Sequence, residues 1–367
     1  MGRFSISLRQ LFSGTRAKRN KQPMFYYCTY FDINYLIKGL ALYRSLVRQA
    51  IPFRLWVLCF DEPTYKILRH LELPEIVPIS LAEFEEGDAE LLGVKANRSR
   101  VEYYFTCTPS LPLYVLKHNA DIDVISYLDA DLFFFSHPTP IYEELGDQSI
   151  LIVGHRFPAH LSQREELNGT YNVGFLSLRK NSIGLQCLEW WRKRCLEWCY
   201  DRPEDGRFAD QKYLDDWPVR FQEVVVLQHK GAGLAPWNVT NYTLSLSNGQ
   251  MLVDSQPLVF YHFHGFRQFY RWLYDPQLTA YGARADDLLK HHIYHAYIRE
   301  LAEVGRWLQG LEGELPLPTD MIRCRVPGGV EQSGLFSAMA KNILHQLAIV
   351  KGVLTGNMWI TVGGKIF

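Results

Sequence analysis

The chain has no excess of either charge, since its 367 residues carry 39 Lys and Arg against 39 Asp and Glu. A general nucleic-acid binder needs a net basic face, so we expect no nucleic-acid partner. The sequence also lacks any apolar run as long as the roughly 18 residues of a membrane-spanning helix. With 47% hydrophobic and 21% charged residues, the composition excludes an intrinsically disordered chain and predicts a sizeable folded core.

Cysteine is also scarce. The seven cysteines are odd in number and spread along the chain, which argues against a disulfide framework. Residues 1–23 contain six cations and no acid, but they lack the apolar run of about 7–15 residues that a secretory signal requires. We therefore predict a flexible basic tail over residues 1–23 and a cytoplasmic protein. The sequence makes no prediction about the oligomeric state.

Apolar segments of strand length alternate with amphipathic helical segments from Met24 to Pro276. This alternation predicts an α/β fold with a mixed, mainly parallel sheet flanked by helices. The expected strands are residues 25–29, 54–60, 75–79, 123–128, 150–153, 173–178, 224–227 and 258–262. The expected helices are residues 34–47, 61–71, most of 83–118, and 182–200. Neither a G-x-G-x-x-G turn nor a P-loop is present, which excludes two common nucleotide-binding loops.

The pattern changes after Pro276. We expect residues 24–276 to form one catalytic domain, residues 277–312 a helical extension with a long helix over 283–309, and residues 313–367 a linker and a C-terminal amphipathic helix over 335–354. No acid follows Glu331, and a basic amphipathic helix can lie on a membrane surface. The alternative is that this helix docks on its own domain or on a second subunit.

Two carboxylates stand where one apolar strand is expected to end, in Tyr127-Leu-Asp-Ala-Asp131. Ligands bind at the carboxyl ends of strands in open α/β sheets. Asp129 and Asp131 have a spacing that can bind a divalent ion that also holds a diphosphate. A turn or a helix cap is the alternative role, and it is the role we assign to the second copy of the pattern, Asp121-Ile-Asp123.

Three further polar clusters interrupt the later apolar segments. Asn172 and Gly174 open a strand, where an amide can bind a sugar hydroxyl and a glycine can let a ligand approach the backbone. Asp210 and Gln211 open a helix, and Asp210 could be only its N-cap.

The last cluster is Phe260-Tyr-His-Phe-His-Gly265. Its two histidines alternate, so they are expected on one face of a strand, and imidazole there suits Mn²⁺ or Zn²⁺. Either histidine could instead belong to the core. Residues 231–238 are expected to form a loop whose Trp237 either stacks on a sugar or packs in the core.

Together these motifs resemble the GT-A-fold glycosyltransferases, most closely a divergent branch of glycosyltransferase family 8, the glycogenin-like enzymes. The resemblance covers residues 24–276. It implies a metal-dependent hexosyltransferase that moves a sugar from a nucleotide-sugar, UDP-hexose above all, to a hydroxyl of a glycan or glycolipid acceptor, as in polysaccharide or lipopolysaccharide synthesis. Mn²⁺ is the implied cofactor, with Mg²⁺ as the alternative. Retention of configuration is implied, although Asp210 could serve an inverting reaction as its base.

The resemblance also implies a role for each motif. Asp129, Asp131 and His262 would bind the metal, with His264 as the competing third ligand. Asp210 and Gln211 would face the transferred sugar as the catalytic pair. The implied nucleotide- and donor-binding residues are Thr29, Tyr30, Arg98, Arg100, Asp129, Asn172, Gly174, Gly265 and Arg267.

One departure from family 8 concerns the Lys-Pro-Trp that usually follows H-x-x-G. Here that place is occupied by Arg267-Gln-Phe-Tyr-Arg-Trp272, so Arg267 or Arg271 would replace the lysine. Two rival functions remain: a nucleotidyltransferase, against which the absence of a Gly-rich loop over residues 29–34 speaks, and a non-catalytic scaffold of the same fold that binds a sugar or nucleotide.

Overall fold

The computed structural model describes residues 24–311, 349–362 and 365–366. The predicted basic tail, most of the linker and the first part of the C-terminal helix lie outside these residues.

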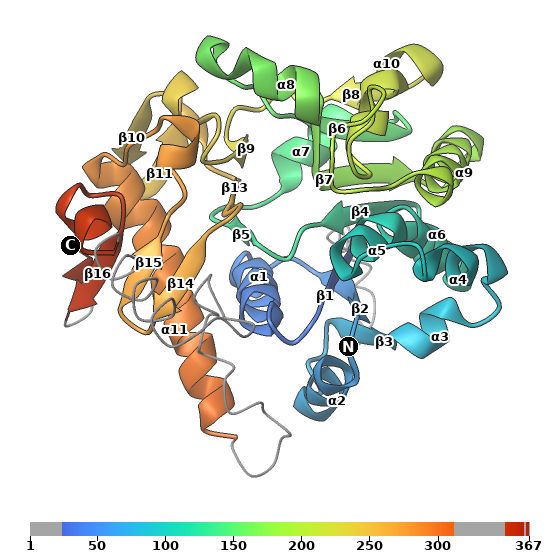
Figure 1. Cartoon of the computed structure of the whole chain (residues 1–367), viewed down its shortest axis with the longest axis horizontal. Helices are drawn as coiled ribbons and strands as arrows, with labels where there is room; N and C mark the ends of the chain where they lie inside the picture. Colours follow the sequence, from blue (N-terminus) through green and yellow to red (C-terminus); the bar gives the residue numbers. More distant parts are fainter. Residues whose placement is uncertain (1–23, 312–348, 363–364, 367) are drawn as a thin grey trace, which may run out of the picture.

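The core of the protein is a seven-stranded sheet in the order β3-β2-β1-β4-β7-β6-β8 (Figure 1). Its strands are β1 (Phe25–Phe31), β2 (Phe53–Cys59), β3 (Ile76–Ser80), β4 (Val124–Leu128), β6 (Ile150–Gly154), β7 (Tyr171–Arg179) and β8 (Val224–Val226). Every neighbouring pair is parallel except the two that β7 forms with β4 and β6. The predicted α/β fold with a mixed, mainly parallel sheet is therefore confirmed.

Helices cover both faces of this sheet, which explains why its strands read as nearly continuous apolar runs. One face packs against α1 (Leu36–Arg48), α2 (Glu62–Leu71) and α7 (Thr139–Leu145). The other packs against α4 (Ala89–Lys95), α5 (Arg100–Cys107), α6 (Ser110–His118), α9 (Ser182–Glu197) and α10 (Trp217–Arg220). The remaining short helices are α3 (Leu81–Glu85) and α8 (Ser162–Asn168).

Helix starts follow local capping chemistry. Asp61 accepts a hydrogen bond from the Thr64 amide (2.9 Å) at the start of α2, and Ser99 forms a capping box with Glu102 at the start of α5. Such side chains satisfy backbone amides that have no partner inside the helix. The sequence therefore indicates where both helices begin.

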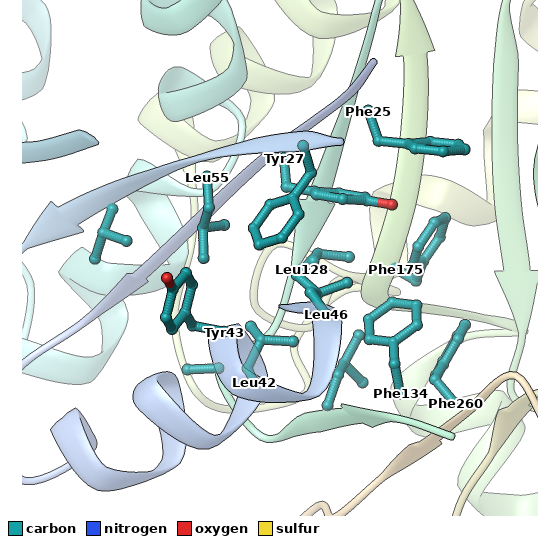
Figure 2. Packing of buried hydrophobic residues seen from close by; sticks show 14 of the residues in the cluster. Phe25, Tyr27, Leu42, Tyr43, Leu46, Leu55, Leu128, Phe134, Phe175 and Phe260 are labelled. Carbon is teal, nitrogen blue, oxygen red and sulfur yellow. The ribbon is translucent and has the colours of Figure 1, made fainter. Parts of the chain in front are cut away.

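A second, three-stranded sheet has the order β5-β13-β9. Its strands are β5 (Leu132–Phe134), β9 (Ala232–Leu234) and β13 (Phe260–His262). Figure 2 shows how Phe134 and Phe260 of this sheet meet Phe175 of β7, and the rings of Phe175 and Phe260 stack at 5.3 Å. The small sheet is therefore fastened to the large one by aromatic packing. A strand was predicted for β13 only, and residues 231–238, expected as a loop, contain β9.

The C-terminal part differs from its prediction in two ways. The helix expected over 283–309 starts later, because the Asp286 carboxylate accepts a hydrogen bond from the Leu289 amide (2.7 Å) and caps it there. It continues through a π-helical turn, Leu289–Tyr294, into α11 (His295–Gln309). Residues 349–354 are helical as expected, but strands that were not predicted follow them.

These last strands belong to a four-stranded sheet of β14 (Arg267–Tyr270), β15 (Leu273–Asp275), β16 (Trp359–Val362) and β17 (Lys365–Ile366). Trp359 of β16 is buried among residues of β13 and α11, and Ile349 packs on Phe269 and Leu273. The described part of the C-terminal segment thus docks on its own domain. A further three-stranded sheet consists of β10 (Leu244–Ser247), β11 (Gln250–Val253) and β12 (Gln256–Pro257).

One buried carboxylate joins α11 to α1. The Glu300 side chain is only 4% exposed and forms ion pairs with Arg44 Nε (2.6 Å) and with Arg48 Nη1. Glu303, one turn later, lies at the more exposed edge of the same contact, 3.4 Å from Arg44 Nη2. The enclosed carboxylate has two charged donors, so we assign it most of the polar stabilisation of this helix pair.

We expect Glu300→Gln to lower the free energy of unfolding by about 2 kcal/mol, because a neutral amide replaces a buried acceptor of two guanidinium groups. Urea unfolding followed by circular dichroism measures this change. Glu303→Gln is the matched control and should change stability by less than about 0.5 kcal/mol. Equal effects of the two substitutions would contradict the role given to Glu300.

Candidate metal centre

Asp129 and Asp131 lie in the turn that joins the large sheet to the small one. The Leu132 amide donates to the Asp129 carbonyl (3.1 Å), which closes the turn. The Asp129 amide donates to the Gly174 carbonyl of β7 (2.9 Å), and the Phe263 amide donates to the Asp131 carbonyl (2.9 Å). Both aspartates are therefore held by backbone hydrogen bonds to neighbouring strands.

His262 completes the cluster from β13, where it pairs with Leu132. Its Nε2 atom lies 3.1 Å from Asp131 Oδ1 and 3.5 Å from Asp129 Oδ2, and one ligand atom of each residue lies within 4.8 Å of the others. His262 Nε2 is buried, yet among the described residues no partner meets it with hydrogen-bond geometry. Two carboxylates and a buried imidazole nitrogen at these distances fit a divalent cation such as Mn²⁺.

The protonation of these three groups is mutually dependent. Desolvation and the charge of Asp131 raise the pKa of Asp129. Desolvation also acts to raise the pKa of Asp131, but the neighbouring His262 outweighs it and holds this pKa below its ordinary value. The pKa of His262 is raised, because Asp131 outweighs the desolvation that would lower it. A proton on His262 thus occupies the charge position that a metal ion would take.

His264 takes a different position from His262. It follows the end of β13 and is exposed, with its ring 5.6 Å from the ring of His262 and 5.4 Å from that of Trp237. The cluster of possible metal ligands contains His262 and does not include His264. Of the two histidines that the sequence left open, His262 therefore lies within the candidate cluster, and its role as a metal ligand stays a prediction.

Gly174 makes room for this histidine. A Cβ atom at Gly174 would lie 2.7 Å from both Cε1 and Nδ1 of His262 and 2.6 Å from Asn172 Oδ1. We expected the glycine to let a ligand approach the backbone, but the space beside it is filled by the His262 ring. Because glycine has no side chain, the His262 ring fits beside Gly174 and next to the two aspartates of the candidate centre.

Asn172 and Gln211 form a connected amide pair beside the cluster. Asn172 Oδ1 accepts from the Gly174 amide (2.9 Å), and Asn172 Nδ2 donates to Gln211 Oε1 (3.1 Å). Gln211 Nε2 in turn donates to the Asn168 carbonyl (2.9 Å). The two motifs, predicted separately as N-x-G and D-Q, thus meet in one network.

His155 is a member of this network that the sequence reasoning missed. Its Nδ1 lies 2.8 Å from the Gly169 carbonyl, and its Nε2 lies 3.4 Å from Asn172 Nδ2. Burial lowers the pKa of His155 to about 3, so the ring is neutral and can donate from Nδ1 while it accepts at Nε2. An isolated histidine after an apolar strand carries no pattern by which it could have been found.

Asp210 is buried near Asp129 and is not a helix cap. The helix that follows, Lys212–Asp216, has no side-chain cap, whereas the Asp210 carboxyl hydrogen-bonds Thr108, whose hydroxyl lies 3.1 Å from Tyr30 Oη. Burial and the charge of Asp129 raise the pKa of Asp210 to about 7. The geometry thus speaks against the capping alternative and places this acid beside the predicted site.

Of the residues predicted to bind the nucleotide, Tyr30 and Arg100 lie near each other, whereas Arg98 points to another helix. Tyr30 is half-buried and reaches Thr108, and Arg100 lies near it with its guanidinium 2.8 Å from Asp32 Oδ2 and 3.6 Å from Asp61 Oδ2. Arg98, by contrast, binds the Leu196 carbonyl of α9 (3.2 Å).

The other predicted residues lie in β1, where Thr29 is found, and at or just before the start of β14, where Gly265 and Arg267 are found. Thr29 is fully buried in the strand. Gly265 has a φ of 70° in the turn after the histidines, and Arg267 is exposed at the start of β14, opposite Asp275. Trp237 is buried 5.2 Å from the ring of His262, so it belongs to the core that supports the centre.

We expect Gly174→Ala to weaken Mn²⁺ binding by roughly tenfold or more, because the added methyl group displaces the His262 ring. Calorimetric titration of the purified protein measures the affinity, and circular dichroism checks that the fold persists. Gly93→Ala is the control, because a Cβ there meets no atom within 4 Å. Unchanged Mn²⁺ affinity in Gly174→Ala would contradict the assignment of His262 as a ligand.

Solved structures of glycosyltransferases share some of this architecture. The galactosyltransferase LgtC, solved in complex with donor and acceptor sugar analogues, is 15% identical, with 81% of this chain and 98% of that chain covered at a TM-score of 0.49. Mouse xyloside xylosyltransferase 1 in its apo form is 14% identical, with 66% and 98% covered at a TM-score of 0.44. At these values the likeness does not establish a function, so the proposals below rest on the site.

No protein-family model matches the chain. Two proteins of Bacillus subtilis (strain 168) are similar over most of their length. The uncharacterized protein YfnF is 34% identical over 250 residues, which cover 66% of this chain and 81% of YfnF. The uncharacterized protein YfnD is 30% identical over 294 residues, which cover 80% of this chain and 92% of YfnD. The chain therefore belongs to the protein family that includes YfnF and YfnD.

Proposed function

We propose that this protein is a metal-dependent glycosyltransferase that moves a sugar, a hexose from UDP in the first instance, to a hydroxyl group of a glycan or glycolipid. The observation that carries the proposal is the Asp129–Asp131–His262 cluster at the carboxyl end of a central strand, in which one ligand atom of each residue lies within 4.8 Å of the others. Mn²⁺, or alternatively Mg²⁺, would bind there and stabilise the negative charge of the departing diphosphate.

The nucleotide would lie beside the carboxyl end of β1. Tyr30 presents a half-buried ring there, and Tyr104 stacks on Phe60 with 3.7 Å between ring centroids. Arg100 is held at the same edge by Asp32, where its remaining donors can contact a phosphate oxygen. Tyr30 and Tyr104 thus supply aromatic rings, and Arg100 supplies a cation, at the carboxyl end of β1. This combination suits a nucleoside diphosphate.

The amide pair supports a retaining reaction. Gln211 can hydrogen-bond a sugar hydroxyl, but an amide cannot take a proton from the acceptor. Asp210 is buried with its pKa raised to about 7, a value that suits a general base, so an inverting reaction through Asp210 is the alternative. Because of the amide pair, we propose retention of the anomeric configuration, which proton NMR of the first-formed product would show directly.

The metal centre is tested by Asp131→Asn. This substitution removes the charge of one ligand with almost no change in volume, so we expect UDP-sugar hydrolysis and transfer to fall at least about a hundredfold while the fold persists. A panel of nucleotide-sugars with and without Mn²⁺ identifies the donor in the wild-type protein. Asp121→Asn is the matched control, because Asp121 belongs to the same D-x-D pattern at the opposite end of the same strand and is exposed.

Full activity of Asp131→Asn would refute the site assignment. The two rival functions give different results in the same panel. A non-catalytic scaffold would bind UDP and Mn²⁺ in calorimetry without turnover of any nucleotide-sugar, and a nucleotidyltransferase would form a nucleotide-sugar from a nucleoside triphosphate and a sugar phosphate.

We further propose that the C-terminal region contacts a membrane surface peripherally, from the cytoplasm. Among the described residues no helix is long and apolar enough to cross a bilayer. However, exposed large side chains gather around the C-terminal sheet, and we name this set the terminal patch: Tyr270, Trp272, Val350, Leu354 and Val362. Arg271 and Lys351 are exposed among them. Aromatic, aliphatic and basic side chains together suit the interface of an anionic membrane.

The double substitution Trp272→Ser and Leu354→Ser tests this contact, since these side chains are 49% and 81% exposed. We expect roughly tenfold weaker sedimentation with vesicles that contain anionic lipid, because the variant loses apolar area that would insert into the interface. Val219→Ser is the control: Val219 is 93% exposed on α10, far from the terminal patch (Figure 1). Unchanged sedimentation of the double variant would exclude the terminal patch as the contact.

A further inference from the structure

The segment that carries Asp210 and Gln211 has an unfavourable backbone conformation. Ala209, directly before the pair, is buried and has a φ of 46°, in the left-handed region that residues with a side chain rarely adopt. Its amide donates to the Tyr200 carbonyl (3.0 Å). Such a conformation persists only where the surrounding structure holds the chain in place. Contacts from other elements must therefore hold the peptide that joins Asp210 to Gln211.

Trp191 provides such a contact from the core. It lies on α9, its side chain is fully buried, and its Nε1 donates to the Asp210 carbonyl (2.8 Å). The indole packs in the apolar cluster that also contains Val173 and Leu176 of β7. Close packing leaves the ring little freedom, and its only polar group is the Nε1 donor. The position of the Asp210 carbonyl is thus set by α9 as well as by the loop itself.

The same hydrogen bond acts on Gln211, because the Asp210 carbonyl and the Gln211 amide belong to one planar peptide unit. A fixed carbonyl therefore fixes the plane from which the Gln211 side chain starts. The far end of that side chain accepts from Asn172 Nδ2 (3.1 Å) and donates to the Asn168 carbonyl (2.9 Å). Gln211 is thus held at both ends, and Trp191 holds the backbone end.

We propose that Trp191 is a positioning residue for the catalytic pair, Asp210 and Gln211. The inference rests on the proposed function, in which these two side chains face the transferred sugar. Trp191 is fully buried, so it acts through the peptide and does not touch the donor. Without the indole donor the strained peptide can rotate, and both side chains leave the geometry that the reaction requires. The metal centre and the nucleotide edge are formed by other segments and keep their geometry.

Trp191→Phe tests this role, because it keeps an aromatic ring in the core and removes the Nε1 donor. We expect kcat with the preferred nucleotide-sugar of the wild-type protein to fall about tenfold or more, while KM for that donor changes less than about threefold. Binding of UDP with Mn²⁺, measured by isothermal titration calorimetry of the full chain, should stay unchanged. Steady-state kinetics with Mn²⁺ provides the split between kcat and KM.

Trp217→Phe is the matched control. Trp217 is also fully buried, and its ring lies 5.3 Å from that of Trp191. Within the described part of the chain, however, its Nε1 has no hydrogen-bond partner. The two substitutions therefore remove the same atoms from the same core, and only Trp191→Phe removes a bond to the catalytic pair. We expect similar losses in urea stability for both variants and a kcat within about threefold of wild type for Trp217→Phe.

The outcomes separate this inference from the proposed function. If the wild-type protein transfers a sugar but kcat is the same in both variants, the role of Trp191 is overturned and the proposed function stands. Failure of Trp191→Phe to fold under conditions in which Trp217→Phe folds would also overturn it, because the hydrogen bond would then serve stability. If the wild-type protein turns over no nucleotide-sugar, the proposed function and this inference fail together.

Discussion

The contact between the His262 ring and the backbone of Gly174 is the constraint on which the candidate site depends. It lies where the small sheet meets the large one, and one residue further along β7 Phe175 stacks on Phe260. Apolar packing holds β13 against β7. As a result, Nδ1 of the His262 ring faces Gly174 of β7, and Nε2 faces Asp131. The position of His262 is thus a consequence of core packing rather than of loop conformation, an arrangement that would keep a metal site rigid.

The sequence predicted the parts of this arrangement that depend on local pattern. β1, β2 and β4 are buried on both faces, so they appear as apolar runs, and Asp129 follows directly where one of them ends. β5 and β9 have three residues each, too few for any periodicity, and their pairing with β13 joins segments that are distant in the chain. The choice between His262 and His264 depended on that pairing: β13 ends at His262, so the strand alternation on which the prediction relied does not extend to His264.

The positions of charged side chains were less predictable, for a reason that Arg98 and Arg100 illustrate. Ser99 caps α5, so the side chains of Arg98 and Arg100 point in different directions. Arg98 reaches α9, and Arg100 reaches Asp32 and Asp61. Long side chains take their partners from tertiary neighbours that a single sequence does not reveal.

The zero net charge of the chain conceals a strong local imbalance at the site. Asp131 and Asp210 are buried and Asp129 is partly exposed, and the raised pKa values of Asp129 and Asp210 reflect the cost of ionising these neighbouring groups. His262 compensates only part of this charge. A divalent ion would remove the repulsion between Asp129 and Asp131. A cation at this position would therefore stabilise the neighbouring carboxylates in their ionised forms.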